Sequence, residues 1–261
     1  MEHQQMTVRF EQVAGVATIT LDRPERLNAL SQDMKNALLE RLQHCAQNDA
    51  VRVVVLRGTD KAFCSGADVT SMSEPTIPIG RQRLHGAHQI IKAIVHMEKP
   101  VIAAVAGAAT GIGWSLALAA DFILASPAAR FGQVFRKIGL VPDGGSVYML
   151  TQYVGVLRAK ELTMTARLVG GEEAFRLGLI TELVDGAALH ERADALAREL
   201  AEAAGLALGM TKRLFLATGG CDLDQFLEFE SHVQNQLIQT QDHAEGVRAF
   251  LDKRKPSFKG L

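Results

Sequence analysis

The sequence has few cysteines and almost no net charge. Its 261 residues hold three cysteines, Cys45, Cys64 and Cys221, and none has CxxC spacing. This argues against a disulfide framework or a zinc site, so we expect no metal and a reducing, cytoplasmic location. Lys and Arg number 28 against 29 Asp and Glu, a net charge of -1, which makes nucleic acid an unexpected partner. The start, MEHQQMTVRF, lacks the charged and apolar regions of a signal peptide.

Long apolar runs are also scarce, with one exception. From Pro100 to Ala120 the chain carries no charge and is long enough to span a bilayer. However, VIAAVA is rich in β-branched residues and predicts a buried strand, whereas WSLALAA predicts a helix. Gly107, Gly111 and Gly113 separate the two halves. We therefore expect a strand, a turn and a helix of a globular protein, with no membrane partner.

The first two-thirds of the chain predict strands and helices in succession. TVRFEQV and VATITLD predict a hairpin that turns at Ala14-Gly15. Ser31 is a candidate cap for a helix with apolar residues at helical spacing, and VRVVVLRG predicts a strand buried on both faces. The polar stretch TSMSEPTIPIG, residues 70–80, predicts a mobile loop before a helix from about residue 81 to 97. DFILAS predicts a further strand.

After residue 144 the pattern favours helices. They are expected at 145–153, 156–164, 172–177, 187–203, 206–217, 222–240 and 243–254, and LITELV predicts one late strand. The fold class is therefore α/β with a helical C-terminal third. A change of pattern near residue 195 divides the chain into residues 1–195 and residues 196–261.

Two glycine-bearing stretches are candidates for stabilising negative charge. They are KAFCSGADV, residues 61–69, and GAATGIGW, residues 107–114, in each of which a strand ends in a turn. Free N–H groups at a helix start attract anions. The spacing GxxxGxG differs from the dinucleotide-binding GxGxxG, and Ser115 in GWSLA does not match the GxSxG elbow of serine hydrolases.

Long motifs spread over nearly the whole chain resemble the enoyl-CoA hydratase/isomerase family, also called the crotonase family. These motifs are ITLDRPERLNALS, FCSGADV, KPVIAAVAGAATGIGWSLALAAD, ARFGQVFRKIGLVPDGG and FLDKRKPSFKG. The resemblance implies a crotonase-like spiral of ββα units with a C-terminal helical trimerisation region. It also implies an acyl-CoA thioester as ligand, no cofactor beyond the coenzyme A of the substrate, and a homotrimer or a dimer of trimers.

The resemblance also implies roles for particular residues. It places the two N–H donors to the thioester oxygen, the oxyanion hole, on Ala67 and Ile112. A hydratase of this family uses two glutamates, and this chain has Ser115 and Phe135 at the matching positions. Neither a hydroxyl nor a phenyl group acts as a carboxylate base near neutral pH. Phe135 would instead make its part of the pocket drier.

Asp143, in GLVPDGGSV, has two interpretations. Proline, aspartate and glycine together are typical of a turn, and the aspartate is a candidate cap for the helix that follows. In family members that move double bonds, an acid often occupies this place, which implies that Asp143 is the base. We expect an enoyl-CoA isomerase that converts a 3-enoyl to a 2-enoyl thioester. An enoyl-CoA hydratase and an acyl-CoA-binding protein without catalysis remain open.

Further residues are weaker candidates for substrate binding. Basic side chains are expected near the coenzyme A phosphates: Arg26, Lys61, and Lys253 or Lys255. The resemblance implies that the backbone of Ala67, Asp68, Val69 and Thr70 lines the adenine and pantetheine path beside Gly111. Phe250 is a candidate for closing the acyl pocket. His85, His88 and His96 share one expected helix without a metal-ligand pattern, so we interpret them as surface residues.

Overall fold

A six-stranded sheet forms the centre of the protein. The computed structural model describes residues 7–71 and 76–260. The strand order is β1 (Val8–Val13), β2 (Val16–Leu21), β3 (Val53–Arg57), β5 (Val101–Val105), β7 (Phe122–Ala125) and β10 (Glu182–Leu183). The first pair is the predicted antiparallel hairpin, and every later pair is parallel. Strand β5 is buried along its whole length, as a strand covered on both faces requires.

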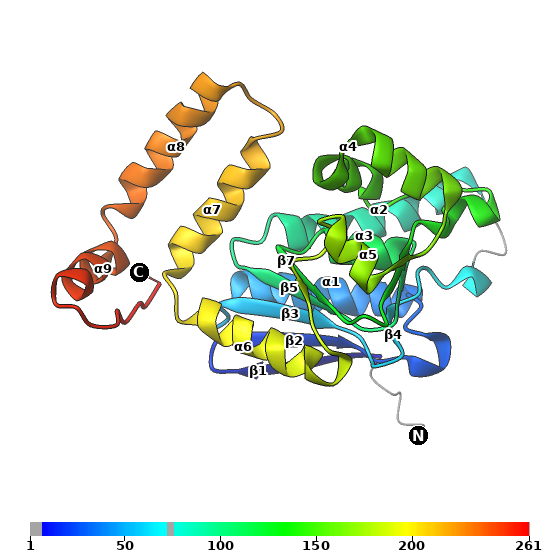
Figure 1. Ribbon diagram of the computed structural model, residues 1–261, viewed down its shortest axis with the longest axis horizontal. Coiled ribbons are helices and arrows are strands. Elements are labelled where there is room, and N and C mark those ends of the chain that lie inside the picture. The colour runs from blue at the N-terminus through cyan, green and yellow to red at the C-terminus, as the bar shows by residue number, and fades with distance from the viewer. Residues whose placement is uncertain (1–6, 72–75, 261) are drawn as a thin grey trace.

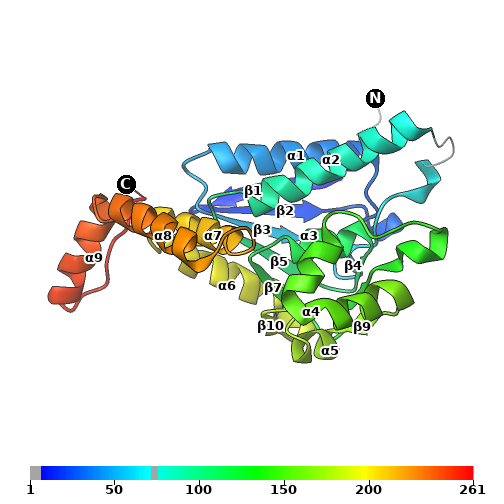
Figure 2. The same cartoon turned by 90° about the horizontal axis from the view of Figure 1, so that it is seen from above.

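Helices cover both faces of this sheet (Figure 2). Helices α1 (Gln32–Gln47) and α2 (Ile77–Val95) pack on one side, and α6 (Leu189–Ala201) packs on the other. Ser31 caps α1 as predicted, because its hydroxyl accepts a hydrogen bond from the Met34 amide at 3.2 Å. Two separate clusters of buried apolar side chains result, one on each face.

A second, smaller sheet lies beside the first. It consists of β4 (Ala62–Cys64), β6 (Ala108–Thr110), β8 (Arg130–Gly132) and β9 (Val169–Gly170), in that order. A strand of the large sheet, a strand of the small sheet and a helix therefore succeed one another repeatedly. The units β5–β6–α3 (Ile112–Leu118) and β7–β8–α4 (Ser146–Thr165) follow this rule. The expected spiral of ββα units is confirmed.

The structure corrects one predicted boundary and confirms one predicted interruption. Helix α2 begins at Ile77 rather than near residue 81, and the Thr76 hydroxyl accepts from the Ile79 amide at its start. The last part of the expected loop is therefore helical, and residues 72–75 lie outside the described residues. The two helices expected at 145–153 and 156–164 are confirmed as two helical segments of α4, which a non-helical residue, Gly155 with a φ of 73°, separates at the expected place.

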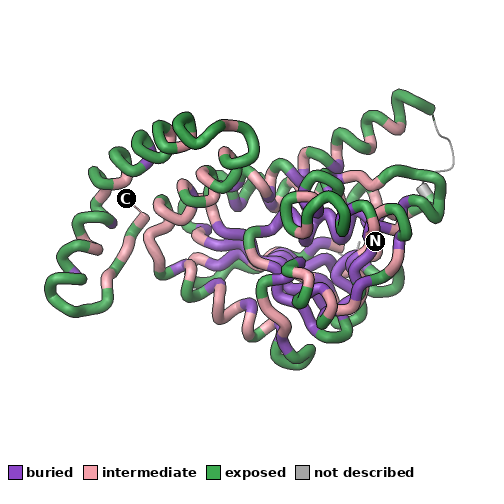
Figure 3. The backbone as a smooth tube through the Cα atoms, turned by 45° about the horizontal axis from the view of Figure 1, so that its top comes forward, coloured by how far each residue is buried: buried purple, intermediate pink, exposed green. Residues whose placement is uncertain are grey.

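The last three helices project away from both sheets (Figure 1). After α5 (Gly171–Arg176) and α6, the chain forms α7 (Gly205–Ala217), α8 (Leu223–Leu237) and α9 (Gln241–Leu251). We call α7–α9 the C-terminal arm. Figure 3 shows that most of this arm is exposed, in contrast to the strands. Helix α6 runs across residue 195, so the proposed division there stays a prediction.

The uncharged run from Pro100 to Ala120 is not a membrane helix. It forms the expected strand β5 and helix α3, and the short strand β6 lies where only a turn was expected. Within the described ranges, no helix combines the length and apolar character needed to cross a bilayer.

Candidate active site

The segments that carry Ala67 and Ile112 lie side by side. A Cβ atom added to Gly111 would lie 3.9 Å from the Gly66 Cα, and one added to Gly66 would lie 3.1 Å from the Thr110 carbonyl oxygen. The small sheet causes this approach, because β4 and β6 are parallel neighbours that end at the same edge. Two turns far apart in the sequence thus meet.

The chain on either side of Ala67 is held by hydrogen bonds. The Leu30 amide donates to the Gly66 carbonyl at 2.8 Å, and the Asp68 amide donates to the Leu30 carbonyl at 3.1 Å. Gly111 is held similarly, because its amide donates to the Gly132 carbonyl at 2.9 Å. Both turns are therefore fixed by bonds that do not use the N–H groups of Ala67 and Ile112.

Those two N–H groups are available to a ligand. Over residues 7–71 and 76–260, neither the Ala67 nor the Ile112 amide donates a hydrogen bond to the protein. Ile112 is the first residue of α3, where the amides have no partner inside the helix and the helix dipole adds positive charge. Two free donors on adjacent backbone segments can both donate to one oxyanion.

The loop that carries Asp143 packs against the start of α3. A Cβ atom added to Gly144 would lie 2.4 Å from the Ile112 Cδ1. Gly144 also has a φ of 62°, so both its conformation and its surroundings exclude a side chain. The Asp143 loop therefore lies against Ile112, the first residue of α3.

The Asp143 side chain does not cap the following helix. The N-cap of α4 is Gly145, which has no side-chain hydrogen bond. Oxygen Oδ1 of Asp143 is buried and has no hydrogen-bond partner among the described residues. A buried acceptor without a partner is costly, and such groups concentrate at functional sites. The turn interpretation explains the backbone here but not the side chain.

Burial raises the pKa of Asp143 above its ordinary value. The charges of His88, on α2, and Lys35, on α1, act in the opposite direction and are smaller influences on this pKa. His88 is exposed, as expected of a surface residue, but it also belongs to the electrostatic surroundings of the carboxylate. A carboxyl whose pKa is raised holds a proton more readily than an ordinary aspartate.

Phe135 supplies an apolar wall. It is buried, and its ring atom Cζ lies 3.6 Å from the position of a Cβ atom on Gly111. The aromatic ring therefore stands against the turn that precedes the Ile112 amide. This position agrees with the expectation that Phe135 keeps its side of the site dry.

The residues after Ala67 form a short, braced turn. Asp68 accepts from the Thr70 hydroxyl at 2.6 Å and from the Arg23 guanidinium at 2.7 Å. These two donors, the hydroxyl first, lower the pKa of Asp68 to about 2. Asp68 is thus an ionised brace rather than a proton carrier, while Val69 and Thr70 are exposed at the surface.

The candidate phosphate-binding residues are partly near this site. The Arg26 carbonyl accepts from the Ser65 hydroxyl at 3.3 Å, and Ser65 precedes Ala67 by two residues. The exposed residue Arg26 therefore lies near Ala67. Lys61 is exposed at the opposite end of β4. Their proposed contacts with coenzyme A stay predictions.

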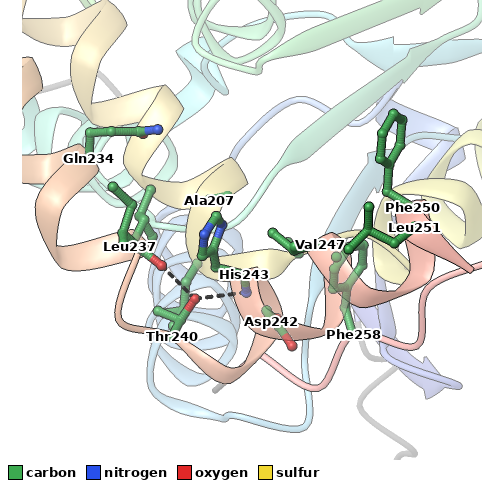
Figure 4. A pocket seen from close by; sticks show the side chains of 14 residues that line it. Ala207, Gln234, Leu237, Thr240, Asp242, His243, Val247, Phe250, Leu251 and Phe258 are labelled. Atoms are coloured by element: carbon green, nitrogen blue, oxygen red, sulfur yellow. Dashed lines mark hydrogen bonds between the residues drawn. The ribbon is translucent and has the colours of Figure 1, made fainter.

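Phe250 and Lys253 lie elsewhere in the chain. Phe250 is in α9 and Lys253 follows that helix, at the far end of the molecule from α3 and α4 (Figure 1). Phe250 borders a hollow of about 480 Å³ whose lining comes mostly from the C-terminal arm. Figure 4 shows apolar side chains around this hollow together with polar ones such as Gln234 and Thr240, and the Thr240 hydroxyl accepts from the His243 amide at 3.1 Å. A single chain therefore does not bring Phe250 to Asp143.

Sequence reasoning did not assign a role to several residues near the site. Arg23 holds Asp68, and the hydroxyls of Ser115 and Ser146 both donate to the carbonyl of Asp143. The partners of Arg23 and Ser115 lie 45 and 28 residues away in the sequence, so no local pattern revealed those two contacts, whereas Ser146 lies only three residues from Asp143. The one available signal was Ser115 itself, a polar residue in an apolar helix.

Comparisons with known proteins agree with this architecture. The family model described as enoyl-CoA hydratase/isomerase matches residues 11–261. A Rhodobacter capsulatus protein named "Probable enoyl-CoA hydratase" is 40% identical, covering 97% of this chain and 98% of its own length. The 1,2-epoxyphenylacetyl-CoA isomerase of Escherichia coli is 36% identical, with 94% and 95% covered. The crystal structure of an enoyl-CoA hydratase from Bacillus anthracis superposes with a TM-score of 0.94 at 31% identity, covering 98% of this chain and 100% of that one.

Proposed function

The chain belongs to the enoyl-CoA hydratase/isomerase family, and from this premise we propose that it is an enoyl-CoA isomerase. It would move the double bond of a 3-enoyl thioester to the 2-position. The observation that carries this proposal is the buried, unpartnered Oδ1 of Asp143, in a loop that packs against the start of α3. That is the arrangement that a single-base proton transfer requires.

The first step of the proposed reaction uses the backbone. The thioester oxygen accepts hydrogen bonds from the Ala67 and Ile112 amides, which stabilise the negative charge that develops on it. Loss of one such donor typically lowers kcat by about a hundred- to a thousandfold. The stabilised enolate makes the C2 protons of the substrate acidic enough for a carboxylate to remove one.

The second step uses the carboxylate alone. Ionised Asp143 takes a proton from C2, and the electrons of that C–H bond enter the conjugated dienolate. The same carboxyl group then returns its proton to C4, and the 2,3 double bond forms as the oxyanion collapses. Burial raises the pKa of Asp143, which makes the carboxylate a stronger base than an exposed aspartate.

A hydratase is the rival within the same family, and the relatives' names include both activities. Two features support the isomerase. At the positions where the family resemblance puts hydratase glutamates, Ser115 already donates its hydroxyl hydrogen to a backbone carbonyl, and Phe135 has no basic atom. Hydration needs a group that holds and activates water, and neither side chain is a carboxylate.

We also propose that the active form is a homotrimer or a dimer of trimers. The C-terminal arm exposes large apolar side chains, among them Phe215, Phe250 and Leu251. Large apolar side chains exposed on one part of a chain favour association between protein molecules. A neighbouring chain that covers this surface would also change the surroundings of Phe250.

The proposal is tested by incubating the protein separately with a 3-enoyl-CoA and a 2-enoyl-CoA. An isomerase converts the first to its 2-enoyl isomer, a hydratase adds water to the second, and a binding protein does neither. We expect Asp143→Asn to lower isomerisation at least a thousandfold while the circular dichroism spectrum is unchanged. Asp224→Asn, the same change on the exposed start of α8, is the control and should retain full activity. Normal turnover by Asp143→Asn would refute the proposal.

A further inference from the structure

The main-chain carbonyl of Asp143 is held by an unusual number of donors. It accepts the Ser115 hydroxyl at 3.0 Å, the Ser146 hydroxyl at 3.0 Å and the Ser146 amide at 3.3 Å. Both serines are completely buried. Buried hydroxyls are retained where their hydrogen bonds are satisfied, and these two share one acceptor. The main-chain carbonyl of Asp143 is therefore held by hydrogen bonds from both α3 and the start of α4.

The two serines come from different helices. Ser115 lies on α3, three residues after Ile112 and thus on the same face of the helix, whereas Ser146 begins α4. The Ser115 hydroxyl consequently joins the helix that offers the oxyanion donor to the loop that carries the carboxylate. It links the two halves of the proposed machinery through one hydrogen bond.

The close packing around Gly144 makes the Ser115 hydrogen bond important for the position of the Asp143 loop. A Cβ atom on Gly144 would lie 2.8 Å from the Ser115 Cβ and 2.4 Å from the Ile112 Cδ1, so the loop already touches α3. There is no room for a side chain between the loop and the helix. Among these contacts, the hydrogen bond from Ser115 is the directional one, and it opposes movement of the loop away from the helix.

We propose that Ser115 is a positioning residue, whose hydroxyl holds the Asp143 carboxylate at a set distance from the Ile112 amide. This inference rests on the proposed role of Asp143 as base. Ser115 does not touch the substrate in this scheme. Proton transfer depends steeply on placement, and a displacement of about 1 Å costs on the order of a hundredfold in rate. Release of the loop would therefore lower the rate of proton transfer more than it weakens thioester binding.

The test compares Ser115→Ala with Ser126→Ala. Ser126 is also almost fully buried, but its hydroxyl has no hydrogen-bond partner among the described residues. Ser126→Ala therefore removes a buried hydroxyl without breaking a hydrogen bond. We expect Ser115→Ala to lower kcat for isomerisation about ten- to a hundredfold with KM changed less than twofold. Ser126→Ala should keep both constants. Equal activity of the two variants would overturn the positioning role.

A double mutant separates positioning from a general effect on folding. In the Asp143→Asn background there is no carboxylate to position, so Ser115→Ala should leave the residual rate unchanged. A further tenfold loss in that background would refute the inference. If Asp143→Asn itself is fully active, the proposed function and the inference both fail. If it is inactive while Ser115→Ala is fully active, only the inference fails.

The pH profile supplies a readout that a purely structural role would not move. A loosened loop exposes the carboxylate, so the acid limb of kcat/KM should shift to lower pH in Ser115→Ala; an unshifted limb counts against the inference. Should this variant not fold, Ser146→Ala removes the second hydroxyl from the same carbonyl. Ser146→Ala should lower kcat about three- to tenfold with KM little changed. An unchanged kcat would refute the proposal that the two hydroxyls together hold the Asp143 carbonyl.

Discussion

The spiral core and the C-terminal arm use the same apolar residue types in opposite ways. In the core, Trp114, Phe63 and Phe131 are fully buried. In the arm, Phe250 is 84% exposed, and Phe215 and Leu251 are each 73% exposed. These aromatic side chains of the core are therefore buried within one chain, whereas those of the arm are not. Exposed apolar surface of this kind is what contacts between protein molecules commonly cover.

The junction of the two regions depends on a few polar contacts and one close approach. The Lys212 ammonium, on α7, binds the Asp121 carboxylate at 2.7 Å and the Ile94 carbonyl at 2.8 Å. Gly209 lets α7 lie on the core, because a Cβ atom there would be 2.3 Å from the Glu98 carbonyl oxygen. The arm is therefore attached at its first helix and again after α9, where the Arg52 guanidinium donates to the Phe258 carbonyl at 3.1 Å.

The largest effect is expected from breaking the core itself. In Gly113→Ala the new Cβ would lie 2.1 Å from the Cys64 carbonyl oxygen, a backbone atom that cannot turn away. We expect a loss of 3 kcal/mol or more, roughly the upper end of overpacking costs, measured by urea unfolding. Gly86→Ala is the control, since its Cβ would meet nothing and should stabilise α2 by about 0.5–1 kcal/mol. Similar stability of both variants would contradict the close packing of α3 on β4.

A smaller loss is expected from breaking the junction. Lys212→Met leaves Asp121, whose side chain is 24% exposed, without its cation, and we expect about 1–3 kcal/mol of destabilisation, between the values for exposed and buried ion pairs. Burial already raises the pKa of Asp121 and lowers that of Lys212. Adding Asp121→Asn should restore most of the stability, because the amide oxygen can still accept from the Val101 amide. If the double variant is no more stable than Lys212→Met, the unpaired charge of Asp121 is not the cause of the destabilisation.

The arm alone is tested by Phe250→Ser. If a neighbouring chain covers Phe250, this change removes about 1.5–3 kcal/mol of apolar burial per subunit without touching the core. We expect a lower mass in light scattering after size-exclusion chromatography, with little change in the melting temperature of the core. Val13→Ser alters a similarly exposed apolar residue at the hairpin and should leave the mass unchanged. An unchanged mass in both variants would argue against the arm as the interface.

The smallest effect concerns the charge of Asp143. Because its pKa is raised in the folded state, its contribution to stability is present at low pH and is lost as the pH rises through that pKa. Asp143→Asn should therefore gain melting temperature relative to the parent at pH 7 and lose that gain near pH 4. The kcat/KM of the parent should fall on the acid side with a midpoint above the ordinary aspartate value of about 3.9. A midpoint at or below that value would contradict the burial of this carboxylate.

Much of the fold was predictable because its signals are local. The hairpin at Ala14-Gly15, the Ser31 cap and the buried strand β3 follow from turn chemistry, capping and apolar runs, and all three are confirmed. The small sheet was not predicted as such, because β4 and β6 have three residues each and too few positions for a pattern. The early start of α2 was missed because Pro78 in its first turn was taken as a sign of a loop.

Sequence by itself determined the identity of the groups at the candidate site. The motifs named Ala67, Ile112 and Asp143, and they established that Ser115 and Phe135 are not carboxylates. Tertiary structure alone decided that the two glycine turns touch, that Asp143 is not a cap, and that Ser115 donates to its carbonyl. The physical reason is range: composition and capping act within a few residues, whereas Ser115 and Asp143 meet only after parallel strands have brought their loops to one edge.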